Sequence, residues 1–182
     1  MNKKIIMTGI LSLTLGGLLM STMFQPVDAR YGENRSSNQN QGTVQVSAAS
    51  AVSAEELVQL ESILTVLIKD EYKARAEYQA LVTKFGEVTP FVNLIKAETS
   101  HIRALTQLFN VYGLDVPADN GSDFAIVPST LAEAYAIGIK AETDNIALYK
   151  AFLEKDLPAN VENAFNHLMD ASESHLSIFI DY

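Results

Sequence analysis

The sequence predicts an all-α domain, a four-helix bundle made of two antiparallel hairpins that a long crossover joins. Three observations predict it. After residue 52, apolar residues recur at helical spacing in four stretches, and no stretch has a convincing strand pattern. Residues that cap or stop helices bound these four stretches. The connections between them are short, long and short in order, and a short connection forces its two helices to run antiparallel.

The first 52 residues are expected to lie outside the bundle. Residues 1–29 have the features of an export signal, with a basic start, an uncharged apolar run and a small-x-small cleavage pattern. The run is also long enough to span a bilayer, so an uncleaved anchor is the alternative. Residues 30–52 are rich in Ser, Asn, Gln and Gly and predict a flexible linker. The folded domain, residues 53–182, is therefore expected to be secreted or periplasmic.

The first hairpin is bounded by capping signals. Ser53 begins a capping box, SAEE, and the apolar spacing continues until Gly86, which predicts a helix over 54–85. The pair Thr89-Pro90 predicts a cap followed by a first-turn proline, and Gly113 ends the next apolar pattern. The second helix is therefore predicted over residues 90–112.

The second hairpin follows the same logic. Thr130 and Glu133 form another capping box and open a helix predicted over 131–154, and the breaker DLPAN separates it from a helix predicted over 158–180. The 16 residues before this hairpin, 114–129, can extend to about 50 Å, whereas a helix of about 24 residues is only about 36 Å long. They can therefore cross the whole bundle, with a simple up-and-down bundle as the alternative.

Each predicted helix interrupts its apolar stripe near the middle with polar residues. The heptapeptide IKAETSH at 95–101 is echoed by IKAETDN at 139–145 and MDASESH at 169–175, so similar layers are built on successive helices. The lysine of each IKxE lies about 200° around the helix from the glutamate and should face solvent. The residues predicted to point inward are Glu71, Glu98, His101, Glu142, Ser172 and His175.

Three carboxylates in a dry core are costly and repel each other unless a cation neutralises them. The inward rows contain no Lys or Arg, whereas glutamate and imidazole are good ligands for iron, manganese or zinc. Simpler explanations stand beside this one. Glu71 and Glu142 could be surface acids if the helix phases are shifted by one position, and His175 could be a hydrogen-bonded core residue. Tyr78 and Tyr149 each lie one heptad after an inward Glu, and we expect them primarily to pack in the core. They could also reach a metal-bound group.

At these residues the chain resembles the ferritin-like superfamily of di-iron carboxylate bundles, which includes ferritins, bacterioferritins and rubrerythrins. Within it, the chain is most similar to an exported branch labelled only as a domain of unknown function. The family pattern is Glu, E-x-x-H, Glu and E-x-x-H on successive helices. The resemblance implies metal ligands at Glu71, Glu98, His101, Glu142 and His175, with Ser172 in place of the remaining Glu. It also implies a role near the iron for Tyr78, our candidate catalytic residue.

The activities that the resemblance implies are oxidation of Fe(II) by oxygen or peroxide, iron storage and peroxide reduction. We expect iron as the cofactor, in one or two positions, with zinc or manganese as alternatives. Ser172 predicts a weaker or more open second position, with Asn145 orienting a ligand. A metal-sequestering module without turnover and a structural surface bundle are the other hypotheses. The formal charge of −9 argues against nucleic acid and anionic membranes as partners, and a homodimer is left open.

Overall fold

The structure is a computed structural model that describes residues 51–181. The predicted export signal and almost all of the predicted linker lie outside these residues. Within the described range, no helix is both long and apolar enough to cross a bilayer. The division of the chain into residues 1–29, 30–52 and 53–182 therefore stays a prediction.

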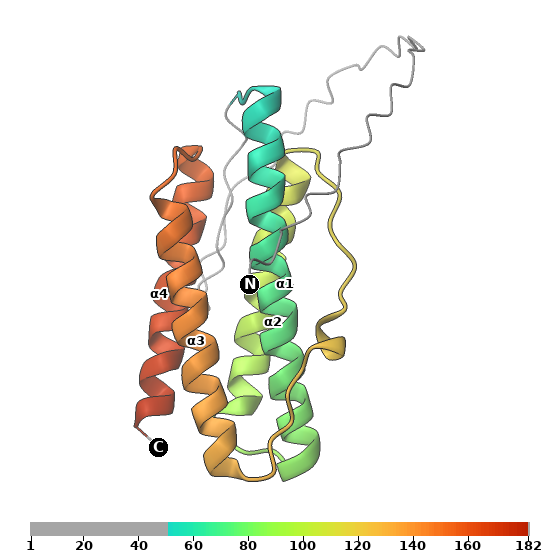
Figure 1. The fold of residues 1–182 in the computed structure, drawn as a ribbon, viewed down its shortest axis with the longest axis vertical. Helices are drawn as coiled ribbons and strands as arrows, with labels where there is room; N and C mark the ends of the chain where they lie inside the picture. The colour runs from blue at the N-terminus through green and yellow to red at the C-terminus, as the bar shows by residue number, and fades with distance from the viewer. Residues whose placement is uncertain (1–50, 182) are drawn as a thin grey trace, which may run out of the picture. The chain divides into compact units, whose positions relative to one another are not determined.

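Four α-helices and one short 3-10 turn make up the described part of the chain (Figure 1). Their bounds are α1 Ala54–Phe85, α2 Phe91–Val111, η1 Gly121–Asp123, α3 Leu131–Leu153 and α4 Ala159–Ile180. Each end agrees with the predicted helix to within one residue, and residues 51–181 contain no strand. The all-α prediction is confirmed.

Local capping explains where two of the helices begin. Ser53 and Glu56 form the predicted capping box at α1, since each side chain accepts a hydrogen bond from the backbone N–H of the other. Thr130 and Glu133 do the same at α3. A capping box satisfies backbone donors that would otherwise lack a partner at the start of a helix. The two signals that were clearest in the sequence therefore fix the starts of α1 and α3.

The start of α2 differs in detail from the prediction. Pro90 is the N-cap and not the first helical residue, and it makes no side-chain capping bond. The reason is that the carbonyl of Pro90 already accepts from the N–H groups of Asn93 and Leu94, so the helical pattern begins one residue later than expected. Proline has no N–H that would need a partner at this position. The helix therefore begins at Phe91.

The two hairpins are connected as the sequence predicts. α1 runs antiparallel to α2, and α3 runs antiparallel to α4 (Figure 1). The segment between α2 and α3 returns along the outside of α1 to the opposite end of the bundle (Figure 1). The crossover is held there by hydrogen bonds, from the Tyr72 hydroxyl to the carbonyl of Pro117 and from the N–H of Ile126 to Glu77. The crossover topology is therefore confirmed over the up-and-down alternative.

The crossover approaches α1 so closely that one position requires glycine. A Cβ atom at Gly121 would lie 2.1 Å from the carbonyl oxygen of Tyr72, a distance that no side chain could occupy. η1 therefore lies directly on the backbone of α1.

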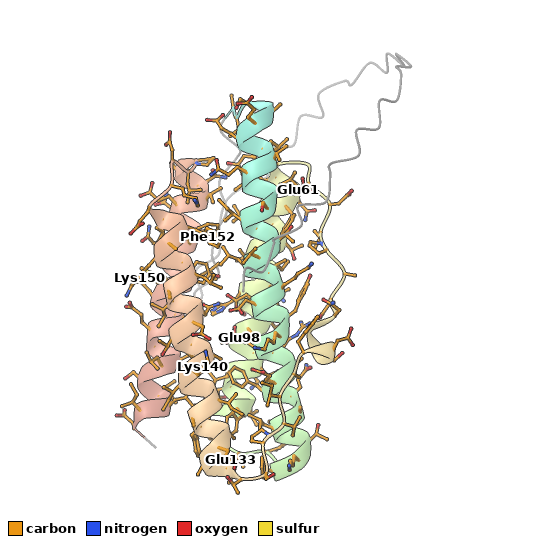
Figure 2. All side chains as sticks on the ribbon, in the orientation of Figure 1. Glu61, Glu98, Glu133, Lys140, Lys150 and Phe152 are labelled. Atoms are coloured by element: carbon orange, nitrogen blue, oxygen red, sulfur yellow. The ribbon has the colours of Figure 1, made fainter. Side chains whose placement is uncertain are left out.

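A polar layer divides the apolar core into two clusters. The larger one contains Leu64, Leu105 and Phe165, and the smaller one contains Leu81 and Phe91. Between them along every helix lie the polar residues that the sequence predicts to point inward. Figure 2 shows Glu98 of this layer among the helices, about midway along the bundle.

Candidate metal centre

All six polar residues predicted to point inward are buried. Their exposed fractions run from 1% to 7%, and they come from all four helices: Glu71, Glu98, His101, Glu142, Ser172 and His175. The alternative that Glu71 and Glu142 are surface acids is therefore wrong. The lysines of the repeated motif are exposed, as predicted, at positions 69, 96 and 140.

The first group of ligands joins α1 to α2. The Nδ1 atom of His101 lies 3.2 Å from Oε2 of Glu71 and 3.0 Å from Oε2 of Glu98. Candidate ligand atoms of these three residues all lie within 4.8 Å of one another, close enough to surround a single ion. The E-x-x-H motif contributes two of them because residues three apart share one face of a helix.

The second group joins α2 to the other hairpin. The Nδ1 atom of His175 lies 3.3 Å from Oε1 of Glu98 and 3.5 Å from Oε1 of Glu142. Candidate ligand atoms of this group also lie within 4.8 Å of one another. The rings of His101 and His175 stack with their centroids 5.4 Å apart.

Glu98 belongs to both groups and divides its two oxygens between them. Oε2 faces His101, and Oε1 faces His175. A carboxylate that presents one oxygen to each of two neighbouring imidazoles has the arrangement needed to bridge two cations. The geometry therefore provides for two adjacent metal positions that share one ligand.

Two buried tyrosines support the outer acids in a reciprocal way. Tyr78 of α1 donates a hydrogen bond of 2.6 Å to Oε1 of Glu142 on α3. Tyr149 of α3 donates one of 2.7 Å to Oε1 of Glu71 on α1. Each tyrosine thus follows the acid of its own helix by one heptad and supports the acid of the other helix. Tyr78, the candidate catalytic residue, contacts a candidate ligand.

Ser172 does not contact the acids of the layer directly. Its hydroxyl donates to Oδ1 of Asn145 at 2.8 Å, and the Nδ2 group of Asn145 donates to Asp70 at 2.9 Å and to Glu71 at 3.4 Å. Asn145 therefore orients a candidate ligand, as the sequence predicts. Glu173, the next residue along α4, pairs with an exposed lysine of α3 and does not replace the missing acid.

In the polar layer, the buried acids and imidazoles shift one another's pKa values. Burial raises the pKa of Glu71. Burial would also raise the pKa of Glu98, but the nearby histidines outweigh it and hold that pKa at about 2. Burial opposes protonation of the histidines, yet the neighbouring carboxylates raise the pKa of His101 well above its usual value and that of His175 to about 9. The neighbouring carboxylates therefore favour the protonated form of both imidazoles.

The residues present fit a divalent cation. The Nδ1 atom of His175 is buried and has no hydrogen-bond partner with acceptable geometry, which is unusual for a buried polar atom unless a ligand satisfies it. The donors are carboxylate oxygens and imidazole nitrogens, which suit iron, manganese or zinc.

Two buried or half-buried acids were missed by the sequence analysis. Asp70 was overlooked beside Glu71, although the acid pair in IKDE could have drawn attention to it. Glu77 is 1% exposed and accepts a hydrogen bond from the N–H of Ile126 beneath the crossover. No sequence signal indicates this contact, because it depends on where the crossover lies.

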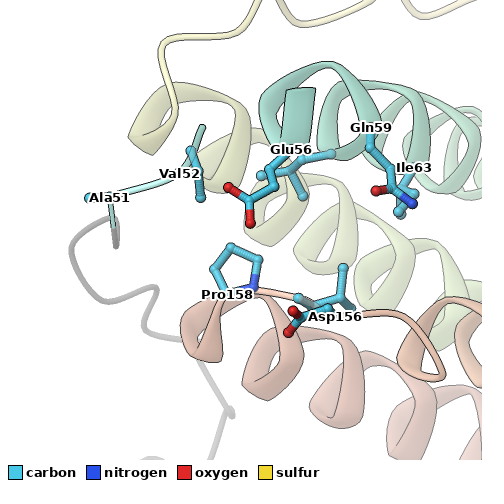
Figure 3. Close-up of a pocket in the computed structure, with 9 residues that line it drawn as sticks. Ala51, Val52, Glu56, Gln59, Ile63, Asp156 and Pro158 are labelled. Atoms are coloured by element: carbon cyan, nitrogen blue, oxygen red, sulfur yellow. The ribbon is translucent and has the colours of Figure 1, made fainter. Parts of the chain in front are cut away.

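A cavity of about 150 Å³ lies elsewhere, where α1 begins beside the turn between α3 and α4 (Figure 3). Its lining includes Glu56, Leu60, Ile63, Asp156 and Pro158. None of the residues of the polar layer reaches it. The buried layer, and not this cavity, carries the candidate chemistry.

One solved structure of known sequence shares the fold of this chain. A search of curated proteins found no match. A similar solved structure is that of a hypothetical protein from Methanococcus jannaschii, with a TM-score of 0.65 and 20% sequence identity over 75% of this chain and 84% of that chain. At this identity the similarity shows a shared fold and nothing about function.

A family model described as an uncharacterized protein domain (DUF2202) matches residues 61–157. The match covers just over half of the chain and includes Glu71, Glu98, His101 and Glu142, whereas α4 with His175 lies beyond it. The chain therefore belongs to the DUF2202 family.

Proposed function

We propose that this protein is an exported ferritin-like metal protein that binds iron in its polar layer and oxidises ferrous iron with oxygen or peroxide. The observation that carries the proposal is the division of the two Glu98 oxygens between His101 and His175. A single structural ion pair would need only one of these contacts. One contact from each Glu98 oxygen is what a pair of metal positions requires.

The proposed ligands are Glu71 and His101 for one position, Glu142 and His175 for the other, and Glu98 for both. Iron supplies the one-electron chemistry that side chains lack. With peroxide as oxidant, two ferrous ions each give up one electron, and hydrogen peroxide takes both electrons and two protons to become two molecules of water.

The protein's own residues would hold the ligands in place and keep the layer dry. Tyr149 fixes Oε1 of Glu71 and leaves Oε2 facing His101. Tyr78 holds Oε1 of Glu142, the oxygen that also faces His175, and so fixes the position of that ligand atom. Tyr78 is also the candidate catalytic residue, and its hydroxyl contacts Glu142, a proposed ligand of the second position. The apolar clusters on both sides exclude water from the layer.

The test is anaerobic addition of Fe(II) to the purified domain, followed by oxygen or peroxide. We expect a ferric absorption band that the double variant Glu98→Ala/His101→Ala lacks. A matched control is Glu61→Ala/Lys69→Ala, which changes two exposed residues of α1. If the wild-type protein binds Fe(II) but gives no ferric band with either oxidant, the redox proposal is wrong.

A second candidate function is metal sequestration without turnover, which one observation favours. Ser172 and Asn145 leave the layer with three carboxylates, so it lacks the fourth acid of the ferritin-like pattern. Zinc competes well for Glu and His ligands, and the usual affinity order places it above ferrous iron. Metal analysis of protein recovered from its native compartment separates the two functions, because zinc without iron favours sequestration.

A further inference from the structure

Four aromatic rings, one from each helix, pack together in the smaller apolar cluster beside the polar layer. Two of them are buried phenylalanines, Phe91 of α2 and Phe179 of α4, and each contacts both of the others, Tyr78 of α1 and Tyr135 of α3. The ring centroid of Tyr78 lies 6.1 Å from that of Phe91 and 5.9 Å from that of Phe179. The centroid of Tyr135 lies 5.5 Å from that of Phe91 and 6.3 Å from that of Phe179. The two tyrosine rings are therefore no more than about 12 Å apart.

The two tyrosines have different surroundings. Tyr78 is 1% exposed, and its hydroxyl donates to Oε1 of Glu142, a proposed metal ligand. Tyr135 packs against the same cluster but is only half-buried. The four rings therefore form a continuous path from a ligand of the polar layer to the surface of the bundle.

Within residues 51–181, Tyr149 has no comparable path, although it has the same relation to the layer. Its hydroxyl donates to Glu71, as that of Tyr78 does to Glu142. Its ring packs edge-on against Phe165 with the centroids 5.7 Å apart, and both rings are 0% exposed. This contact leads to another buried ring and not to a partly exposed tyrosine. Of the two tyrosines that hold the outer acids, Tyr78 is therefore the one connected to the surface.

The residue types of the path suit the transfer of single electrons. A phenol gives up one electron together with its proton far more readily than a benzene ring gives up an electron. Tyr78 and Tyr135 can therefore each hold an oxidising equivalent, whereas Phe91 and Phe179 serve only as the medium between them. Electron tunnelling slows less steeply with distance through packed atoms than across empty space, so a close-packed interior favours transfer over this separation.

We propose that an oxidising equivalent produced in the polar layer passes through Tyr78 to Tyr135, and that Tyr135 is the site at which a small phenol from solution is oxidised. The proposal rests on the proposed redox function, and it adds a second substrate class and a surface site for it. Tyr78 acts at the ligand end of the path and Tyr135 at the solvent end.

The electrons and protons balance with peroxide as the oxidant. One electron comes from a ferrous ion and one from Tyr78, and hydrogen peroxide takes both, with two protons from solvent, to become two molecules of water. The phenolic proton of Tyr78 moves along its hydrogen bond to Glu142, and it returns when Tyr135 supplies the missing electron. Tyr135 releases its own proton to solvent and becomes a tyrosyl radical. A phenol with a weaker O–H bond then gives Tyr135 a hydrogen atom and restores it.

The test uses the full chain loaded anaerobically with Fe(II), followed by peroxide in the presence of the spin trap nitroso-tert-butane, which bonds to tyrosyl radicals. The ferric band is recorded in every sample, and the trapped tyrosine is identified by peptide mass spectrometry. We expect an adduct at Tyr135 in the wild-type protein and its loss in Tyr78→Phe. The matched control is Tyr149→Phe, the same change at the other tyrosine that holds an outer acid, which should keep the adduct.

A second variant covers the case in which Tyr78→Phe fails to fold or to bind iron. Tyr135→Phe leaves every residue of the polar layer in place, so the radical should remain on the buried Tyr78. Electron paramagnetic resonance should then show a tyrosyl radical that added hydroquinone, a phenol, reduces more slowly than the radical of the wild-type protein.

If the wild-type protein gives a ferric band but no adduct at Tyr135, the inference is wrong and the redox function stands. It is also wrong if Tyr78→Phe keeps the adduct, because the oxidising equivalent would then reach Tyr135 by another route. Equal rates of reduction by hydroquinone in Tyr135→Phe and the wild type would contradict it as well. A wild-type protein that gives no ferric band would instead contradict the proposed function itself.

Discussion

Replacing Glu98 by glutamine should remove most of the stabilisation that bound metal gives to the fold. The substitution keeps the shape of a side chain that is 2% exposed, but it takes one charged ligand from both metal positions at once. For each of the two positions, a metal concentration about 100 times the dissociation constant stabilises the wild-type fold by about 2.7 kcal/mol. For a domain of this size that is a rise in Tm of about 10 °C.

The expected loss of metal affinity in Glu98→Gln follows from the one shared ligand that the variant lacks. Removing a residue that merely supports a ligand costs about 10- to 100-fold in metal affinity, and removing a shared ligand should cost at least as much as the upper value. At the same metal concentration, a 100-fold loss of affinity leaves a stabilisation of about 0.4 kcal/mol per position, or a Tm rise of about 1 to 2 °C per position.

The assay is thermal unfolding followed by circular dichroism, with and without Fe(II) or Zn(II). Glu61→Gln is the matched control, because it makes the same chemical change at an exposed position of α1 and should keep the full shift. If Glu98→Gln itself unfolds, Glu142→Gln removes a ligand from one position only and should keep part of the shift. A Glu98→Gln protein that gains as much stability from metal as the wild type would refute the shared-ligand geometry.

Two other predictions concern the metal-free layer. Tyr78→Phe and Tyr149→Phe should each destabilise the fold by about 1.5–3 kcal/mol in urea unfolding, because each removes a donor from a buried carboxylate; a cost for only one of them would contradict the reciprocal arrangement. Because the folded pKa of His175 is raised to about 9 from an ordinary value near 6.5, its stabilising contribution is full below about pH 6.5 and is lost as the pH rises to about 9. Urea unfolding of the chelated protein between pH 6 and 10 should show this loss, whereas a stability that is flat over this range would contradict it.

The helices and the inward layer could be predicted because both depend on local rules. The capping box of Ser53 and the stop at Gly86 are read within a few residues of sequence, and they fix α1. Once the bounds are known, helical periodicity decides which face an acid such as Glu71 occupies. The absence of basic residues from the inward rows then indicates a cation.

The contacts between helices could not be predicted in the same way, because they depend on how far each helix is rotated and shifted against its neighbours. Periodicity places Tyr149 inward, but it does not say that its hydroxyl reaches Glu71 of another helix. The same holds for Asn145, whose amide spans from Asp70 to Ser172. Glu77 faces the crossover, whose path no periodicity describes.

The most direct test of the central claim is anomalous X-ray scattering from crystals of the metal-loaded protein, recorded at the absorption edge of the bound metal. We expect two neighbouring peaks within the polar layer, one between Glu98 and His101 and one between Glu98 and His175. Metal-loaded crystals whose anomalous peaks all lie outside this layer would contradict it.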